Sequence, residues 1–168
     1  MFGRQHVYSY YFFTFLLKFF TENVDTVEFY DDYLLCRQCG HDITEASHLK
    51  SIASRIALHQ RNDTILGVRG VLLQLFRNPA GKEFELVTVS KADVIGVTGW
   101  YEDHTWFPGY SWKIGICPRC GQHVGWLFQE IDKEDDSAID FIGLIMEKLI
   151  HQSYADSLIT GPRSLRSR

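Results

Sequence analysis

The fold of this chain is decided by the stretch His104–Trp112, HTWFPGYSW, followed by the cysteine pair Cys117–Cys120, CPRC, and then by Gly125-Trp126. A second cysteine pair with the same spacing, Cys36–Cys39, lies nearer the start of the 168 residues. These four cysteines are all that the sequence contains. The pattern predicts one metal site assembled from two distant segments, with three tryptophans gathered beside the second segment.

The two cysteine pairs have the spacing of zinc-binding turns. Two thiolates separated by two residues can hold one ion from a tight turn, and a second such turn completes a tetrahedron. Gly40 and Gly121 each follow the last cysteine of a pair, where glycine relieves backbone strain. Four sulfur ligands leave no open coordination position, so we expect a structural zinc bound by Cys36, Cys39, Cys117 and Cys120. Two disulfides or four free thiols are the alternatives, and His123 is expected to pack or hydrogen-bond rather than to ligate.

The tryptophans suggest an aromatic box. Trp106 and Trp112 are separated by a Pro-Gly turn, so the two indoles can face each other from neighbouring segments. Trp126 would lie on a strand anchored by the metal, and Phe128 could close the remaining side. Tryptophans are also common core residues. A box of this kind suits a quaternary ammonium, which Glu102 and Asp103 would favour, or a small neutral ring between the indoles.

Composition and charge exclude some classes of partner. The chain is 45% apolar and 23% charged, which is ordinary for one globular domain with extra segments at its ends. A formal charge of −4 argues against a general binder of nucleic acid or of anionic membranes.

The amino-terminal run from Val7 to Leu17 is apolar and aromatic. A helix needs about 20 apolar residues to span a bilayer, so no stable membrane span is expected. The run matches the hydrophobic region of a signal peptide, cleaved near residue 22, and an edge strand or a loose extension is the alternative. Secretion is therefore expected, with the cytoplasm as the alternative, and Asn62-Asp63-Thr64 would be a glycosylation acceptor only on the secretory route.

Short alternating runs between the cysteine pairs predict strands. Val71–Phe76 and Phe84–Val89 flank the turn sequence Arg77–Gly81 and predict a hairpin. Trp112–Ile116 and Val124–Phe128 are further strand candidates around the second pair. The segment Glu45–His59 has no firm period and predicts either a helix or a loop.

The carboxyl side predicts a helix. Its apolar residues follow helical spacing from Asp140, an acid that suits the start of a helix, to an end near Gln152. These residues are Phe141, Ile142, Leu144, Ile145, Leu149 and Ile150. The chain should fray beyond Tyr154, so the architecture is mainly β with one closing helix.

The motif series is specific to a known family. Cys-x-x-Cys, then HTWFPGYSW, then Cys-x-x-Cys-Gly-x-His-x-Gly-Trp resembles the CULT, or thalidomide-binding, domains of the cereblon type, from about Leu34 to His151. The resemblance implies a β-tent fold, in which two antiparallel sheets are pinned at one end by zinc. It divides the chain into an extension over 1–30, the CULT-like zinc-binding domain over 31–154 and a flexible tail over 155–168.

The resemblance also implies a ligand. In this family three tryptophans form a cage for cyclic imides such as glutarimide and for uracil-like rings. Trp106, Trp112 and Trp126 would be the walls and Phe128 the floor, while the backbone of His104 and Trp106 would bind the imide edge. The ligand-binding residues carried over are Asn78, Pro79, His104, Thr105, Trp106, Trp112, Trp126 and Phe128. Thr105 stands where related proteins often have serine, and Trp100 has no counterpart.

Three classes of function follow from these residues. The first is a non-enzymatic module that binds small cyclic imides, free or at damaged protein ends. The second is a binder of methylated ammonium groups or of protein partners. The third is an enzyme like the methionine sulfoxide reductases with a similar zinc-bearing tent, which is disfavoured because every cysteine is used for the metal. The domains that precede this one in cereblon are not in the sequence, so binding to a ubiquitin ligase adaptor is not expected.

Overall fold

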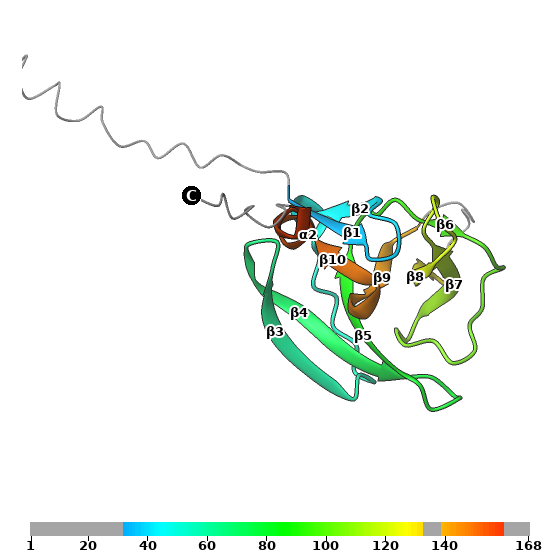
Figure 1. The fold of residues 1–168 in the computed structure, drawn as a ribbon. Coiled ribbons are helices and arrows are strands. Elements are labelled where there is room, and N and C mark those ends of the chain that lie inside the picture. The colour runs from blue at the N-terminus through cyan, green and yellow to red at the C-terminus, as the bar shows by residue number, and fades with distance from the viewer. Residues whose placement is uncertain (1–31, 133–138, 160–168) are drawn as a thin grey trace, which may run out of the picture. The chain divides into compact units, whose positions relative to one another are not determined.

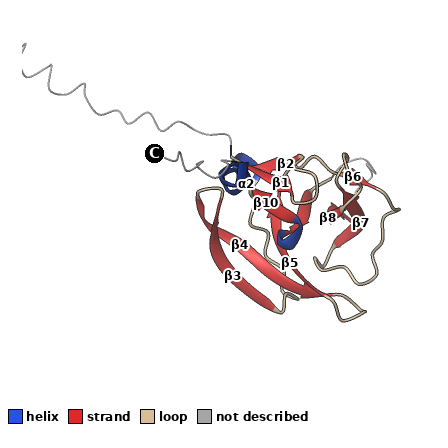
Figure 2. Ribbon diagram, viewed as in Figure 1, coloured by secondary structure: helices blue, strands red, loops and turns tan. Residues whose placement is uncertain are grey.

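The structure is a computed structural model that describes residues 32–132 and 139–159. The expected signal peptide and most of the expected tail lie outside these residues, so secretion stays a prediction. Within the described residues, ten strands form two antiparallel sheets, and one α-helix follows the last strand (Figures 1 and 2). This confirms a mainly β fold of two antiparallel sheets with a carboxyl-terminal helix.

The larger sheet has seven strands in the order β3-β4-β5-β9-β8-β7-β6. Their bounds are β3 His59–Ile65, β4 Val68–Arg77, β5 Glu83–Val89, β6 Ile95–Gly96, β7 Tyr110–Ile116, β8 His123–Glu130 and β9 Phe141–Ile145. The smaller sheet has the order β10-β1-β2, with β1 Tyr33–Cys36, β2 Asp42–Glu45 and β10 Leu149–His151. The chain passes from the larger to the smaller sheet through a 3-10 turn at Met146–Lys148, and helix α2 spans Gln152–Ile159.

The strands predicted around the turn residues are confirmed. β4 and β5 form the expected hairpin, whose turn is closed when Asn78 N–H donates to the Lys82 carbonyl (2.9 Å) and Gly81 N–H donates to the Asn78 carbonyl (2.9 Å). β7 and β8 form the second hairpin around the second cysteine pair. The segment between Glu45 and His59 is a loop with a single 3-10 turn at Ala46–His48.

The helix predicted from Asp140 to Gln152 is wrong. Phe141–Ile145 is strand β9, every residue of which is buried. Ile142 and Leu144 belong to one core, and Phe141 and Ile145 to another, so both faces of this strand are covered. A strand buried on both faces is apolar throughout, and periodicity alone does not distinguish it from a helix. The helix begins only at Gln152 and continues past Tyr154, where we expected fraying.

Two cores lie on opposite faces of the larger sheet, because successive side chains of a strand alternate in direction. One core is aliphatic and joins the larger sheet to the smaller one, with Leu73, Val87 and Leu127 packed together with Leu34 and Ile43. The other core is aromatic. Its buried members are Phe76, Phe84, Leu86, Phe107, Phe128, Phe141 and Ile145, and the three tryptophans of the expected cage pack against it. The candidate cage therefore lies on the face of the sheet turned away from the smaller sheet.

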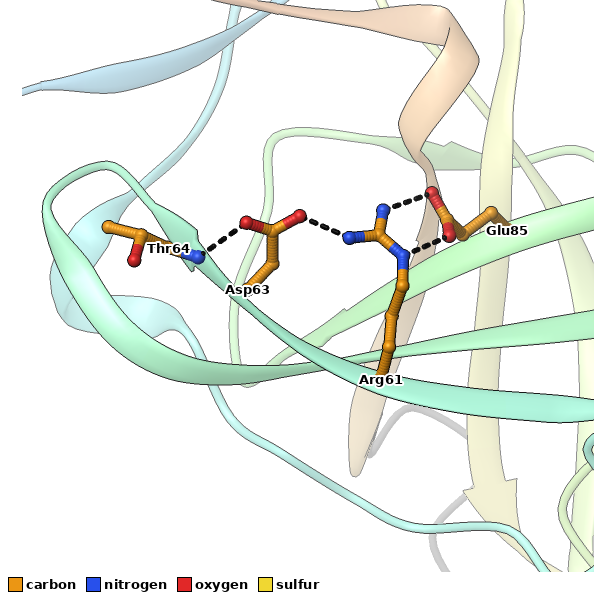
Figure 3. A network of polar contacts seen from close by, with 4 residues as sticks. All are labelled: Arg61, Asp63, Thr64 and Glu85. Carbon is orange, nitrogen blue, oxygen red and sulfur yellow. Dashed lines mark hydrogen bonds and ion pairs between the residues drawn. The ribbon is translucent and has the colours of Figure 1, made fainter.

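A polar network ties the edge strand β3 to the sheet (Figure 3). Arg61 on β3 reaches across β4 and donates two hydrogen bonds to Glu85 on β5, of 2.9 and 3.0 Å. Its guanidinium also donates to Asp63, and the other Asp63 oxygen accepts a hydrogen bond from the Thr64 N–H (2.7 Å). Charged side chains on an edge strand discourage pairing with another chain, so this network suits the outer end of the sheet.

Candidate metal and ligand site

The four cysteines form one cluster. Their sulfur atoms all lie within 4.8 Å of one another, with Cys36 Sγ 3.7 Å from Cys120 Sγ and Cys39 Sγ 3.6 Å from Cys117 Sγ. A disulfide would require about 2.05 Å. Four sulfurs held about 2.3 Å from a tetrahedral zinc would lie about 3.8 Å apart. The cluster therefore fits a metal and not two disulfides, as the spacing of the cysteines predicts.

The two cysteine turns have the same geometry. In the first turn, Gly40 N–H donates to the Cys36 carbonyl (2.8 Å), and in the second Gly121 N–H donates to the Cys117 carbonyl (2.9 Å). Both glycines have a φ of +72°, in the left-handed region that favours glycine. The same backbone turn is thus used twice, and each turn presents two sulfurs to one point.

Zinc bound at this cluster would stabilise the fold by linking its two sheets. The first turn connects β1 to β2 in the smaller sheet, and the second connects β7 to β8 in the larger sheet. Burial is the main cause that raises the pKa of the Cys36 thiol, to about 12. A zinc ion would bind the four thiolates, release protons and join the ends of the two sheets.

The hairpin held by the second cysteine turn carries three residues of the expected cage, Trp112, Trp126 and Phe128, together with the apolar residue Ile114. Trp112 lies opposite Phe128 and Ile114 opposite Trp126 in the β7–β8 register. Residues two apart on a strand share a face, and directly paired residues lie on the same face. These four side chains therefore form one apolar patch on the aromatic side of the sheet.

The loop before β7 fixes the position of Trp112 by hydrogen bonds and a ring contact. Tyr101 and Trp112 exchange two backbone hydrogen bonds of 2.8 Å, and their rings lie 5.0 Å apart. The Trp112 indole N–H donates to the Asp103 carbonyl (2.9 Å). The next residue, His104, has a φ of +58°, a left-handed conformation that turns the chain back toward Trp106. Trp112 can thus offer a ligand its ring face, because its N–H is already used.

The β4–β5 hairpin supplies the opposite side. The Trp106 indole N–H reaches the Arg77 carbonyl at 3.4 Å, and its ring stacks on Phe76 with centroids 5.1 Å apart. Asn78 accepts a hydrogen bond from the Lys82 N–H at its Oδ1 atom (2.8 Å). That bond fixes the side-chain amide of Asn78, which lines the cavity described next.

A cavity of about 440 Å³ lies between these elements. It is lined by Asn78, Pro79, Phe84, His104, Trp106, Trp112, Ile114, His123, Trp126 and Phe128. Of the eight ligand-binding residues expected from the sequence, seven line this cavity. The exception is Thr105, whose side chain hydrogen-bonds with the backbone of Phe107.

Sequence reasoning missed Phe84, Ile114 and His123. Phe84 packs edge-on against Trp126 with centroids 5.1 Å apart, and His123 does the same at 4.5 Å. Trp106 approaches the same indole at 4.7 Å. The alternation of Phe84–Val89 and Trp112–Ile116 indicated strands, but only the long-range register shows which faces of those strands meet.

The cavity lining holds no carboxylate among the described residues. Glu102 and Asp103, which were expected to favour a cation, do not line it. His123 donates its Nε2–H to the Gly125 carbonyl (3.0 Å). Burial lowers the pKa of His123, and the charges of Lys82 and Lys148 act in the same direction, so the ring is neutral at physiological pH. The described lining is therefore mostly aromatic and apolar, and it contains no carboxylate.

Within the described residues, no helix combines the length and the apolar character that crossing a membrane requires.

No protein-family model matches the chain. Its curated relatives include cereblon of Gallus gallus, 42% identical over 74 residues that make up 44% of this chain and 16% of that protein. Cereblon of Danio rerio is 40% identical over 74 residues, 44% of this chain and 17% of that protein. Cereblon of Drosophila melanogaster is 33% identical over 127 residues, 68% of this chain and 19% of that protein.

The chain thus spans less than a fifth of the length of these relatives. The similarity extends over as much as 69% of this chain. Together with the two antiparallel sheets and the four-cysteine cluster, it shows that the chain contains a cereblon-type domain.

Proposed function

We propose that this domain is a non-enzymatic module whose cavity binds a small cyclic imide or uracil-like ring. The observation that carries the proposal is the cavity itself, in which three indole rings and Phe128 surround a space of about 440 Å³ without a lining carboxylate among the described residues. A flat neutral ring can stack against indole faces. A quaternary ammonium would have its charge compensated only by the rings.

The polar groups near the cavity suit the edge of an imide. An imide presents a carbonyl, an N–H and a second carbonyl in a row, and it therefore needs an acceptor between donors. Within the described residues, no hydrogen bond uses the His104 carbonyl or the Trp106 N–H. The Trp106 carbonyl accepts a hydrogen bond from the Ser54 hydroxyl, which fixes this part of the loop. These free backbone groups support binding of the imide edge by the His104–Trp106 segment.

Titration of tryptophan fluorescence with glutarimide tests the proposal. Glutarimide should quench the fluorescence of the wild-type domain, and Trp126→Ala should weaken binding on the order of tenfold or more, because stacking on an aromatic side chain contributes about 1–3 kcal/mol. Trp100→Ala is the matched control, since Trp100 packs against the aliphatic core and does not line the cavity.

Circular dichroism of both variants would establish that each is folded. Absence of any response to glutarimide or uridine at millimolar concentration in the folded wild-type protein would refute the proposal. Tighter binding of tetramethylammonium than of glutarimide would instead support a site for methylated ammonium groups.

A further inference from the structure

A lysine, Lys82, lies beside the aromatic wall of the cavity. The Lys82 ammonium lies 5.0 Å from the centre of the Phe84 ring, and Phe84 lines the cavity. Phe84 is 7% exposed and contacts the rings of both Trp126 and Trp106. The charge of Lys82 is therefore held next to the wall that Phe84 forms with these two indoles.

The position of Lys82 is fixed by its backbone. Its N–H donates to Asn78 Oδ1 (2.8 Å), and its carbonyl accepts a hydrogen bond from Asn78 N–H (2.9 Å). Asn78 itself lines the cavity. Asn78, which would contact a ligand, thus also fixes the backbone of Lys82.

The ammonium of Lys82 has no carboxylate partner among the described residues. The neighbouring acid, Glu83, pairs with Arg77 at 2.6 Å. Glu102 and Asp103 belong to the loop that holds Trp112, on the other side of the cavity. His123, which packs on Trp126 near Lys82, carries no charge at neutral pH. On the side of Phe84 and Trp126, the part of the chain that the structure describes therefore places the Lys82 ammonium beside the cavity without a carboxylate partner.

We propose that the cavity selects rings whose substituent ends in a carboxylate, and that Lys82 is the residue that recognises this charge. The inference rests on the proposed function, because it takes the ring itself to be bound between the indoles. A substituent on a ring bound between the indoles must cross the border of the cavity to reach solvent. A carboxylate passing Lys82 gains attraction that a neutral amide does not, and an ammonium is repelled.

Three derivatives of 3-aminoglutarimide, with equal arms that end in a carboxylate, a primary amide or an ammonium, test this selection by calorimetry. At low ionic strength the carboxylate should bind about two- to fivefold more tightly than the amide, the range expected for an exposed ion pair. The ammonium should bind more weakly than the amide. The differences should shrink in about 1 M salt, where the screening length falls to about 3 Å.

Variants of Lys82 identify the residue responsible. Lys82→Gln should bind all three derivatives equally, and Lys82→Arg should keep the preference. Lys113→Gln is the matched control, because Lys113 also lies over an aromatic ring, that of Trp100 at 4.0 Å, but does not line the cavity. Its preference should equal that of the wild type.

The outcomes separate the two proposals. Equal binding of the three derivatives to the wild type, or a preference that persists in Lys82→Gln, would overturn this inference and leave ring binding intact. Failure of all three derivatives to bind would overturn the proposed function and this inference with it.

Discussion

Trp126 makes edge-to-face contacts with three rings, those of Trp106, Phe84 and His123, and so lies at the centre of the aromatic contacts beside the cavity. Edge-to-face contacts of this kind fix ring orientation and contribute about 0.5–1.5 kcal/mol each beyond burial. Of the three, only His123 can change its charge near neutral pH. It is therefore the residue through which pH should act on this part of the domain.

His123 should make the domain less stable in mild acid. Its pKa is lowered in the folded state, mainly by burial, so the unfolded chain binds a proton more readily. The stability that neutral His123 contributes is fully present above its unfolded pKa of about 6.5 and is lost as the pH falls through the lower, folded value. Thermal unfolding of the zinc-saturated protein between about pH 7.5 and 5 should therefore show a smaller drop in Tm for His123→Gln than for the wild type.

The exposed His59 on β3 offers the control, since His59→Gln should lose as much Tm in acid as the wild type does. Protonation of the cysteine ligands lowers the stability of all three proteins alike. Equal slopes of Tm against pH for His123→Gln and the wild type would contradict this role of His123.

Strand β8 is the element that links the metal turn to the cavity, and it lies very close to β9. A Cβ atom placed on Gly125 would meet the Gly143 carbonyl oxygen at 2.2 Å, and both atoms belong to backbones that cannot move independently. Gly125→Ala should therefore cost at least about 1–3 kcal/mol, the usual range for overpacking, and should displace Trp126. Urea unfolding monitored by circular dichroism measures this loss.

Gly99→Ala is the matched control, because a Cβ at Gly99 meets no atom within 4 Å and Gly99 lacks a left-handed φ. We expect it to change the free energy of unfolding by less than about 0.5 kcal/mol. Similar stability of Gly125→Ala and Gly99→Ala would mean that β8 and β9 can separate more easily than their spacing indicates.

The elements also show what local sequence can and cannot predict. The β4–β5 hairpin was predictable because Phe84–Val89 alternates and Asn78-Pro79 begins a turn, and both signals act over a few residues. The strand at Phe141–Ile145 was not predictable, since a strand covered on both faces has no polar face and so shows no alternation of polar and apolar residues. The cavity residues Phe84 and Ile114 were missed for a related reason, because the register that brings their strands together is set by contacts distant in sequence.

Across the whole domain, the metal cluster and the cavity occupy opposite sides of one sheet. Cys36 and Cys117 are fully buried members of the aliphatic core, whereas the tryptophans pack on the aromatic core. The β7–β8 hairpin contributes to both the metal cluster and the cavity. Its turn carries Cys117 and Cys120, and its face toward the aromatic core carries Trp112 and Trp126. The geometry of the cavity should therefore depend on a metal that no ligand touches.

Removal of the metal tests this dependence. Structural zinc contributes about 10–16 kcal/mol of apparent free energy in small zinc domains, and a whole domain is usually stable by only about 5–15 kcal/mol. Chelation should thus abolish cooperative unfolding and eliminate glutarimide binding together, and added Zn²⁺ should restore both with one ion per chain by elemental analysis. Cys39→Ser should resemble the chelated protein, because it removes one of the four sulfurs. A chelated protein that still unfolds cooperatively and binds glutarimide with unchanged affinity would show that the two sheets hold the cavity without the metal.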